Sequence, residues 1–228
     1  MLSFVKQIQI KVGARDSSLS RVQVEEVFSL LQCHHAEIVF CLEWFQTQGD
    51  LDQTTSLTSM ERTDFFTKEI DEAILQGKCR IGIHSAKDLK DPLPDYLQVV
   101  AYTKGIDPSD VIVFRDSLSL DDLPFEAKIG TSSLRREKNI KALRNDLKCV
   151  DIRGTIEKRL ALLDSGAFDA IVVANAALIR LKLIRSVMQL PGENSPMQGR
   201  LAVVAKVGDF EMKELFACMH EVSIKEPV

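Results

Sequence analysis

The 228-residue chain is 45% hydrophobic and 27% charged, with a formal net charge of −4. This length is enough for a substantial hydrophobic core, in one large or two small domains. No apolar run reaches the roughly 18 residues of a membrane span, and the first residues lack the apolar segment of a signal peptide, so we expect a cytoplasmic protein.

The cysteines and histidines predict neither disulfides nor a metal site. The five cysteines are odd in number and have no CxxC spacing, which is typical of reduced thiols in a cytoplasmic protein. His34 and His35 are adjacent, so they cannot face one metal ion together from a regular element, and no HxxxH or HExxH pattern occurs. We therefore expect no bound metal.

Strand and helix patterns alternate along the first part of the chain. Apolar and polar residues alternate from Ile8, two later stretches have helical spacing, and a stretch rich in Thr and Ser separates them. The predicted elements are a strand at Ile8–Val12, a helix at Leu19–Gln32, a strand at Ala36–Phe40, a long loop at Glu43–Asp64, a helix at Phe65–Leu75 ending near Gly77, and a strand at Arg80–Ile83.

The same alternation continues to the end of the chain. Near-continuous apolar strands such as AIVVA, with helical stretches between them, indicate an α/β fold with mostly parallel sheets. Strands are predicted at Leu97–Tyr102, Val111–Phe114, Lys128–Ile129, Cys149–Ile152, Ala170–Ala174 and Leu201–Val207, and helices at Leu134–Leu143, Ile156–Asp164 and Ala176–Leu181.

Two stretches rich in turn-forming residues, Thr103–Asp110 and Gln189–Pro196, divide the chain. A further apolar strand, LAVVAKV, follows the second stretch, which suggests that the chain crosses to a second sheet and then returns. We therefore expect a discontinuous first domain of residues 1–103 plus 196–228 and a second domain of residues 104–195.

Positive charge is concentrated in one segment. Between Lys128 and Arg185 there are 13 Lys or Arg residues against 6 Asp or Glu, although the whole chain is acidic. A local basic segment indicates an anionic partner. Because the segment has a single aromatic residue, Phe168, it offers no base-stacking platform, and small carboxylate or phosphate ligands fit better than nucleic acid.

Polar groups follow several predicted strands directly, where ligands bind in open α/β sheets. RIGIHSAKD ends an apolar strand with His84, Lys87 and Asp88, while GTSS and RGT join strands to helix N-termini that suit anions. Asp88, a carboxylate among cations, is the strongest catalytic candidate, with a surface turn as the alternative. His84 is interpreted as a hydrogen-bonded structural residue.

The motifs HSAKD, IGTSSLRR, RGTIEKRL, LDSGAFDAIVVANAALIRL and QGRLAV, in this order, resemble the hydroxymethylbilane synthase (porphobilinogen deaminase) family over about Ile8–Val204. The resemblance implies two domains like the lobes of periplasmic binding proteins, with the active-site cleft between them. It also implies a transferase that condenses four porphobilinogen molecules, with loss of ammonia, into a linear tetrapyrrole for porphyrin and haem biosynthesis.

The resemblance assigns roles motif by motif. Asp88 would be the general acid and base, with Lys87 beside it. A dipyrromethane cofactor, porphobilinogen and polycarboxylate tetrapyrrole intermediates would be the ligands of a monomer, without nucleic acid, membrane or metal. The residues that would bind acetate and propionate groups are Arg15, Ser17, Ser133, Arg135, Arg136, Arg153, Arg159 and Arg180.

The sequence departs from the family pattern near its end. The family attaches dipyrromethane to the cysteine of a GGC motif in a third domain, and this sequence, which stops at Val228, contains no GGC. It therefore looks like a shortened form, and Cys218 is not assigned that role. The cofactor could still be held noncovalently, and weak or altered synthase activity is expected. A catalytically silent polycarboxylate-binding relative is the alternative, and an anion-sensing two-lobed domain is a third.

Overall fold

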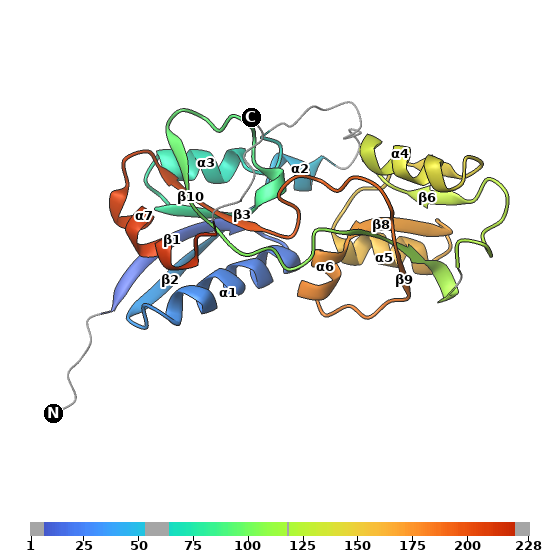
Figure 1. Ribbon diagram of the computed structural model, residues 1–228. Helices are drawn as coiled ribbons and strands as arrows, with labels where there is room; N and C mark the ends of the chain where they lie inside the picture. The colour runs from blue at the N-terminus through green and yellow to red at the C-terminus, as the bar shows by residue number, and fades with distance from the viewer. Residues whose placement is uncertain (1–6, 53–63, 118, 222–228) are drawn as a thin grey trace. The chain divides into compact units, whose positions relative to one another are not determined.

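The computed structural model describes residues 7–52, 64–117 and 119–221 (Figure 1). The chain forms two compact units. Unit 1 comprises Met1–Gly49, Arg62–Gly105 and Arg200–Val228, and unit 2 comprises Asp50–Glu61 and Ile106–Gly199. Each unit is built around its own five-stranded sheet.

Unit 1 has the sheet order β2-β1-β3-β10-β4. Its elements are β1 (Ile8–Arg15), α1 (Ser18–Gln32), β2 (Ile38–Phe45), α3 (Lys68–Leu75), β3 (Ile81–Ser85) with a following 3-10 turn (Ala86–Asp88), β4 (Leu97–Tyr102), β10 (Leu201–Lys206), α7 (Phe210–Leu215) and a second 3-10 turn (Phe216–Met219); α2 (Gln48–Leu51) lies where the chain passes to unit 2.

Unit 2 repeats this arrangement in the order β7-β6-β8-β5-β9. Its elements are β5 (Asp110–Phe114), a 3-10 turn (Arg115–Ser117), β6 (Lys128–Gly130), α4 (Leu134–Leu143), β7 (Lys148–Val150), α5 (Ile156–Asp164), β8 (Ala170–Ala174), α6 (Asn175–Arg180) and β9 (Val187–Gln189).

Both sheets are mostly parallel, as predicted. In unit 1, β1 pairs in parallel with β2 and β3, and only β10 runs against its neighbours β3 and β4. In unit 2, β6 pairs in parallel with β7 and β8, and only β5 runs against β8 and β9. The carboxyl ends of the parallel strands therefore meet at one edge of each sheet.

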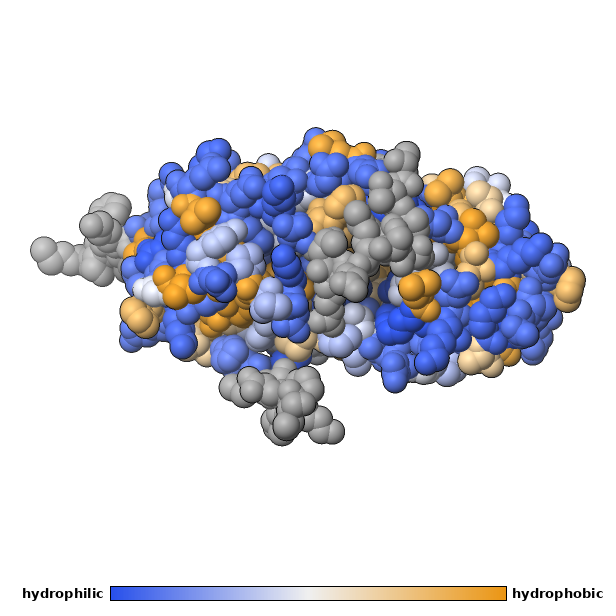
Figure 2. Space-filling view, turned by 90° about the horizontal axis from the view of Figure 1, so that it is seen from above, coloured by the Kyte–Doolittle hydropathy of each residue, from blue (hydrophilic) through white to orange (hydrophobic). Residues whose placement is uncertain are grey.

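Helices cover both faces of the unit 1 sheet, with α1 and α3 on opposite sides (Figure 1). On one face, Val24 and Val27 of α1 belong to the buried core that includes Ile83 of β3. On the other face, α3 approaches closely because the strands carry glycines there: a Cβ at Gly82 would lie 2.8 Å from Cγ2 of Ile70. The face seen in Figure 2 is mainly hydrophilic, with scattered apolar residues.

Strand β1 continues three residues beyond the prediction, to Arg15, and β7 ends two residues before it, at Val150. Three other elements differ more. The predicted loop at Glu43–Asp64 is wrong in its first part, because β2 continues to Phe45 in parallel register with β1 and α2 follows. Residues 53–63 of that loop lie outside the described residues. Helix α3 begins at Lys68, three residues later than predicted, and the short strand β9, which pairs with β5, was not predicted.

Two glycines with left-handed backbone give a matched stability test. Gly199 has φ +85° and a Cβ there would lie 2.5 Å from the carbonyl oxygen of Asp107, whereas Gly77 has φ +74° with no atom within 4 Å of such a Cβ. An alanine in this conformation costs about 1–2 kcal/mol at either position. We expect Gly199→Ala to lower the free energy of unfolding by about 2 kcal/mol more than Gly77→Ala, because only Gly199→Ala also meets backbone. Urea titration checks this, and equal losses would contradict the close contact.

Candidate functional site

Asp88 lies at the carboxyl end of β3, in the turn Ala86–Asp88. Three contacts hold this turn: Ser85 lies opposite Leu201 in the β3–β10 ladder, Ala86 N donates to the Arg200 carbonyl (3.0 Å), and Ser85 Oγ accepts from Gln23 Nε2 (2.9 Å). Asp88 is half-buried. Within the described parts of the chain its carboxylate has no hydrogen bond or ion pair, so it is available to a ligand.

Arg15 is the last residue of the neighbouring strand β1, and Ser17 follows two residues later. The Arg15 guanidinium carbon lies 4.5 Å from the centroid of the Phe66 ring, a cation–π contact that orients the side chain. Ser17 is the N-cap of α1, and its Oγ accepts from Ser20 N (3.2 Å) while its O–H can still donate. Unit 1 therefore brings Arg15, Ser17 and Asp88 to one edge of its sheet.

In unit 2, Ser133, Arg135 and Arg136 begin α4 after β6, and Ser133 caps the helix. Both arginines bind one carboxylate, Asp110, which is fully buried: Arg135 Nη2 and Arg136 Nη2 each lie 2.6 Å from it. Gln198 Nε2 donates to the same carboxylate at 3.0 Å. Arg135 also donates to the Glu193 carbonyl, so both arginine side chains are fixed within the unit.

The charge of Asp110 depends on these partners. Burial alone would raise the pKa of Asp110, but hydrogen bonds and charge from Arg136, with further hydrogen bonds from Arg135 and Gln198, hold it below its ordinary value. Arg136 is 9% exposed and donates through Nη1 to the Val172 carbonyl (3.2 Å). Its Nε is buried and has no hydrogen-bond partner among the described residues.

The remaining predicted arginines follow the next two strands of the unit 2 sheet. Arg153 comes after β7 and donates to the Asp52 carbonyl (3.0 Å), and Arg159 in α5 donates through Nε to the Gly154 carbonyl (2.9 Å). Arg180, at the end of α6, is 7% exposed and donates to the Gly199 carbonyl (2.9 Å). Each guanidinium is thus oriented by a main-chain oxygen of its own unit.

Sequence reasoning missed Asp110, which binds Arg135 and Arg136, and Gln198, which donates to Asp110. A signal was present, because Asp110 is a charged residue that opens the otherwise apolar strand DVIVF. A charge at that place is stable only with a partner. The identity of the partners, however, depends on contacts between residues far apart in the sequence.

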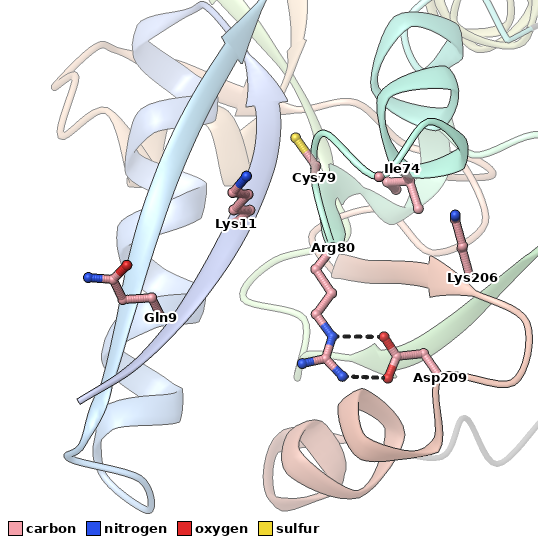
Figure 3. Close-up of a pocket in the computed structure, with 8 residues that line it drawn as sticks. Gln9, Lys11, Ile74, Cys79, Arg80, Lys206 and Asp209 are labelled. Atoms are coloured by element: carbon pink, nitrogen blue, oxygen red, sulfur yellow. Dashed lines mark hydrogen bonds and ion pairs between the residues drawn. The ribbon is translucent and has the colours of Figure 1, made fainter. Parts of the chain in front are cut away.

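A cavity of about 430 Å³ lies elsewhere in unit 1, near the residues where β1 and β3 begin (Figure 3). Lys11 and Lys206 line it, and Arg80 points to Asp209, with which it forms two hydrogen bonds of 2.9 and 3.0 Å. Because Asp88 lies at the opposite end of β3, this cavity is separate from the Asp88 edge.

Among the described residues, no three His, Cys, Asp or Glu side chains are grouped as a metal ion requires. In the same part of the chain, no helix combines the length and apolar character needed to cross a membrane.

The sequence matches a known family over most of its length. The family described as "Porphobilinogen deaminase, dipyromethane cofactor binding domain" matches residues 10–214. "Probable porphobilinogen deaminase" of Chlamydia muridarum is 44% identical over 200 residues, which cover 87% of this chain and 82% of the relative. "Porphobilinogen deaminase" of Natranaerobius thermophilus is 33% identical over 226 residues, which cover 97% of this chain but 73% of that relative, so the chlamydial protein is the shorter of the two.

Solved structures with the same architecture share little sequence. The periplasmic VFT2 domain of Bordetella pertussis BvgS has a TM-score of 0.54 and 13% identity, covering 94% of this chain and 88% of that chain. The probable amino-acid ABC transporter extracellular-binding protein ytmK of Bacillus subtilis has a TM-score of 0.53 and 12% identity, covering 93% and 90%. At this identity the likeness concerns the fold alone, and it confirms the prediction of domains like the lobes of periplasmic binding proteins.

The buried carboxylate of unit 2 leads to a stability prediction. Asp110→Ala leaves two guanidiniums without their carboxylate, and we expect a loss of about 3–5 kcal/mol in the free energy of unfolding. The control is Asp164→Ala, which removes an exposed ion pair with Arg185 (2.8 Å) and should cost at most about 1 kcal/mol. Chemical denaturation of both variants measures the difference.

The ion pairs of Asp110 with Arg135 and Arg136 also determine how the stability of the fold depends on pH. Because the pKa of Asp110 lies below its ordinary 3.8 in the folded chain, its contribution to stability is complete above pH 3.8 and is lost as the pH falls through the lower folded-state value. The wild type should therefore lose more stability in acid than Asp110→Ala does. A parallel acid dependence of the two proteins would show that Asp110 is not paired as described.

Proposed function

Because this chain belongs to the porphobilinogen deaminase family, we propose that it catalyses the stepwise deaminating condensation of four porphobilinogen molecules into the linear tetrapyrrole hydroxymethylbilane. Family membership makes it a transferase of porphyrin biosynthesis. The proposal rests mainly on Asp88 of HSAKD. Its carboxylate is half-buried and has no hydrogen bond or ion pair with any described residue.

Asp88 would act on the aminomethyl group of porphobilinogen. As an acid it gives a proton to the amine, the C–N bond breaks, and ammonia leaves with the electron pair of that bond. The carboxylate then stabilises the cationic methylene-pyrrole that remains. After the new C–C bond has formed, a carboxylate in the same place accepts the proton that the pyrrole ring loses.

The predicted cations suit a substrate with two carboxylates on each pyrrole. Charged hydrogen bonds of this kind contribute about 1.5–3 kcal/mol each. We propose that Arg15 and Ser17 of unit 1 and Ser133, Arg135, Arg153 and Arg159 of unit 2 bind carboxylates, and that Lys87 acts with Asp88 in catalysis. Arg180 is buried, so its part would be to hold the neighbouring backbone in place. Arg136 holds Asp110 through Nη2, and its Nε is the atom that remains for a ligand.

The unit 2 residues also fit the dipyrromethane cofactor named in the description of the family. Buried donors are nearly always paired, yet Nε of Arg136 has no acceptor among the described residues, and a carboxylate is the acceptor that a guanidinium prefers. Ser133, Arg153, Arg159 and the Nε of Arg136 would hold the group. When bound, dipyrromethane supplies the pyrrole chain end to which new units are added.

Asp88→Asn tests the catalytic role. Loss of proton transfer should lower kcat for porphobilinogen consumption by about 10²–10⁴-fold, with the thermal unfolding temperature unchanged. Asp95→Asn, which removes an exposed carboxylate seven positions away, is the control and should keep wild-type kcat. Unchanged consumption by Asp88→Asn would refute the mechanism.

The manner of cofactor retention is tested by intact mass. We propose that the unit 2 side chains retain dipyrromethane noncovalently, and a dipyrromethane-sized increment should appear under native conditions and vanish on unfolding. An increment that survives unfolding would reveal a covalent bond through another side chain. Absence of the increment under both conditions would refute cofactor binding by this chain.

A further inference from the structure

A buried carboxylate and a buried imidazole face each other between α3 and β3. Asp71 and His84 are each 4% exposed, and Asp71 Oδ1 lies 3.9 Å from His84 Nε2. Neither atom has a hydrogen-bond partner among the described residues. Because buried polar atoms are nearly always paired, two unpaired atoms that face each other call for a physical explanation.

The strand is built to accept the imidazole. Gly82 and His84 lie two residues apart on β3 and so face the same side of the sheet, toward α3. A Cβ at Gly82 would lie 2.8 Å from His84 Nε2, and equally close to Ile70 of α3. The ring therefore occupies space that any other residue at position 82 would take.

The surroundings of the pair favour a neutral imidazole and an anionic carboxylate at neutral pH. Burial, with the positive charge of Arg15 on β1, lowers the pKa of His84 to about 4. Burial raises the pKa of Asp71 to about 6, and the charges of Asp64 and Glu69 act in the same direction against a hydrogen bond from Thr67. Tyr96, before β4, lies within range of the Asp71 charge.

We propose that His84, as the Nε2–H tautomer, donates a hydrogen bond to ionised Asp71, directly or through one water, and that the two are positioning residues for Asp88. A direct bond needs an approach of about 1 Å from the observed separation, and a water can bridge the gap otherwise. The turn that carries Asp88 is held on its other sides by α1 and β10. The contact between Asp71 and His84 connects β3, the strand before this turn, to α3.

The consequence for catalysis rests on the proposed function and is tested by Asp71→Asn. If this substitution misplaces Asp88, kcat should fall by about 10- to 100-fold with little change in KM. The wild type should lose kcat as the pH falls through about 6, where Asp71 is protonated, and Asp71→Asn should lack this acid limb. Glu72→Gln removes the same charge from the next, exposed residue of α3 and should keep both kcat and the acid limb.

Nitrogen NMR of His84 supplies a readout that does not depend on turnover. We expect the Nε2–H tautomer in the wild type at neutral pH, a neutral ring down to about pH 5, and a changed Nε2 shift in Asp71→Asn. If the wild type shows this tautomer but consumes no porphobilinogen, the pair stands and the proposed function fails. If the wild type is active with the Nδ1–H tautomer, or Asp71→Asn keeps the wild-type pH profile, the pair is refuted.

Two substitutions of His84 test the same proposal if Asp71→Asn does not fold. His84→Gln keeps an N–H donor close to the place of Nε2 and should retain most of kcat, whereas His84→Leu fills the space without a donor and should lose it. Equal kcat in both variants would overturn the proposal.

Discussion

Parallel hydrogen bonding within each sheet determines where functional side chains can lie. Parallel neighbours such as β1 and β3, or β6 and β8, end at the same edge, and each needs a crossover that returns the chain to the opposite edge. Residues that immediately follow the strands are then collected at one edge without contributing to the core. Arg15 and Asp88 come to the same edge of the sheet for this reason, although 72 residues separate them in the sequence.

The antiparallel strands β5 and β10 support the candidate site residues in a different way. Strand β5 is the first strand of unit 2 and β10 the first after the chain returns to unit 1, and each lies fourth in its sheet. The start of β10 is held to the end of β3 by the Ala86–Arg200 hydrogen bond, and the start of β5 carries Asp110. In each unit the strand that enters from the other unit therefore supports the candidate site residues.

Much of the fold could be predicted because the signals are local. Helices α4 and α5 have the predicted bounds, since Ser133 and Thr155 are N-caps whose side chains accept main-chain hydrogen bonds three residues on. Strand β9 has three residues, and its pairing with β5 is a tertiary effect that no short pattern contains. Strand β2 extends past its apolar core because pairing with β1 satisfies the backbone of Glu43 and its neighbours.

The candidate site was less predictable than the fold. Motif order placed Asp88 and the arginines after strands, but an arginine that binds a ligand and an arginine that holds the protein together look alike in a sequence. The structure separates them: Arg136 is committed to Asp110 and the Val172 carbonyl, while Arg15 lies against Phe66 at the edge of its sheet. The partner of Arg136 is 26 residues away, beyond any local pattern.

The buried pair of unit 1 shows how a site can respond to pH while the fold does not. Asp71, with its pKa raised from 3.8 to about 6, contributes stability below pH 3.8 that is lost as the pH rises through 6. His84, with its pKa lowered from 6.5 to about 4, contributes stability above pH 6.5 that is lost as the pH falls through 4. Between pH 4 and 6 the folded chain holds one proton on Asp71 and the unfolded chain holds one on His84. The two dependences cancel there, so protonation of Asp71 can alter the support of Asp88 at little net change in stability from the pair.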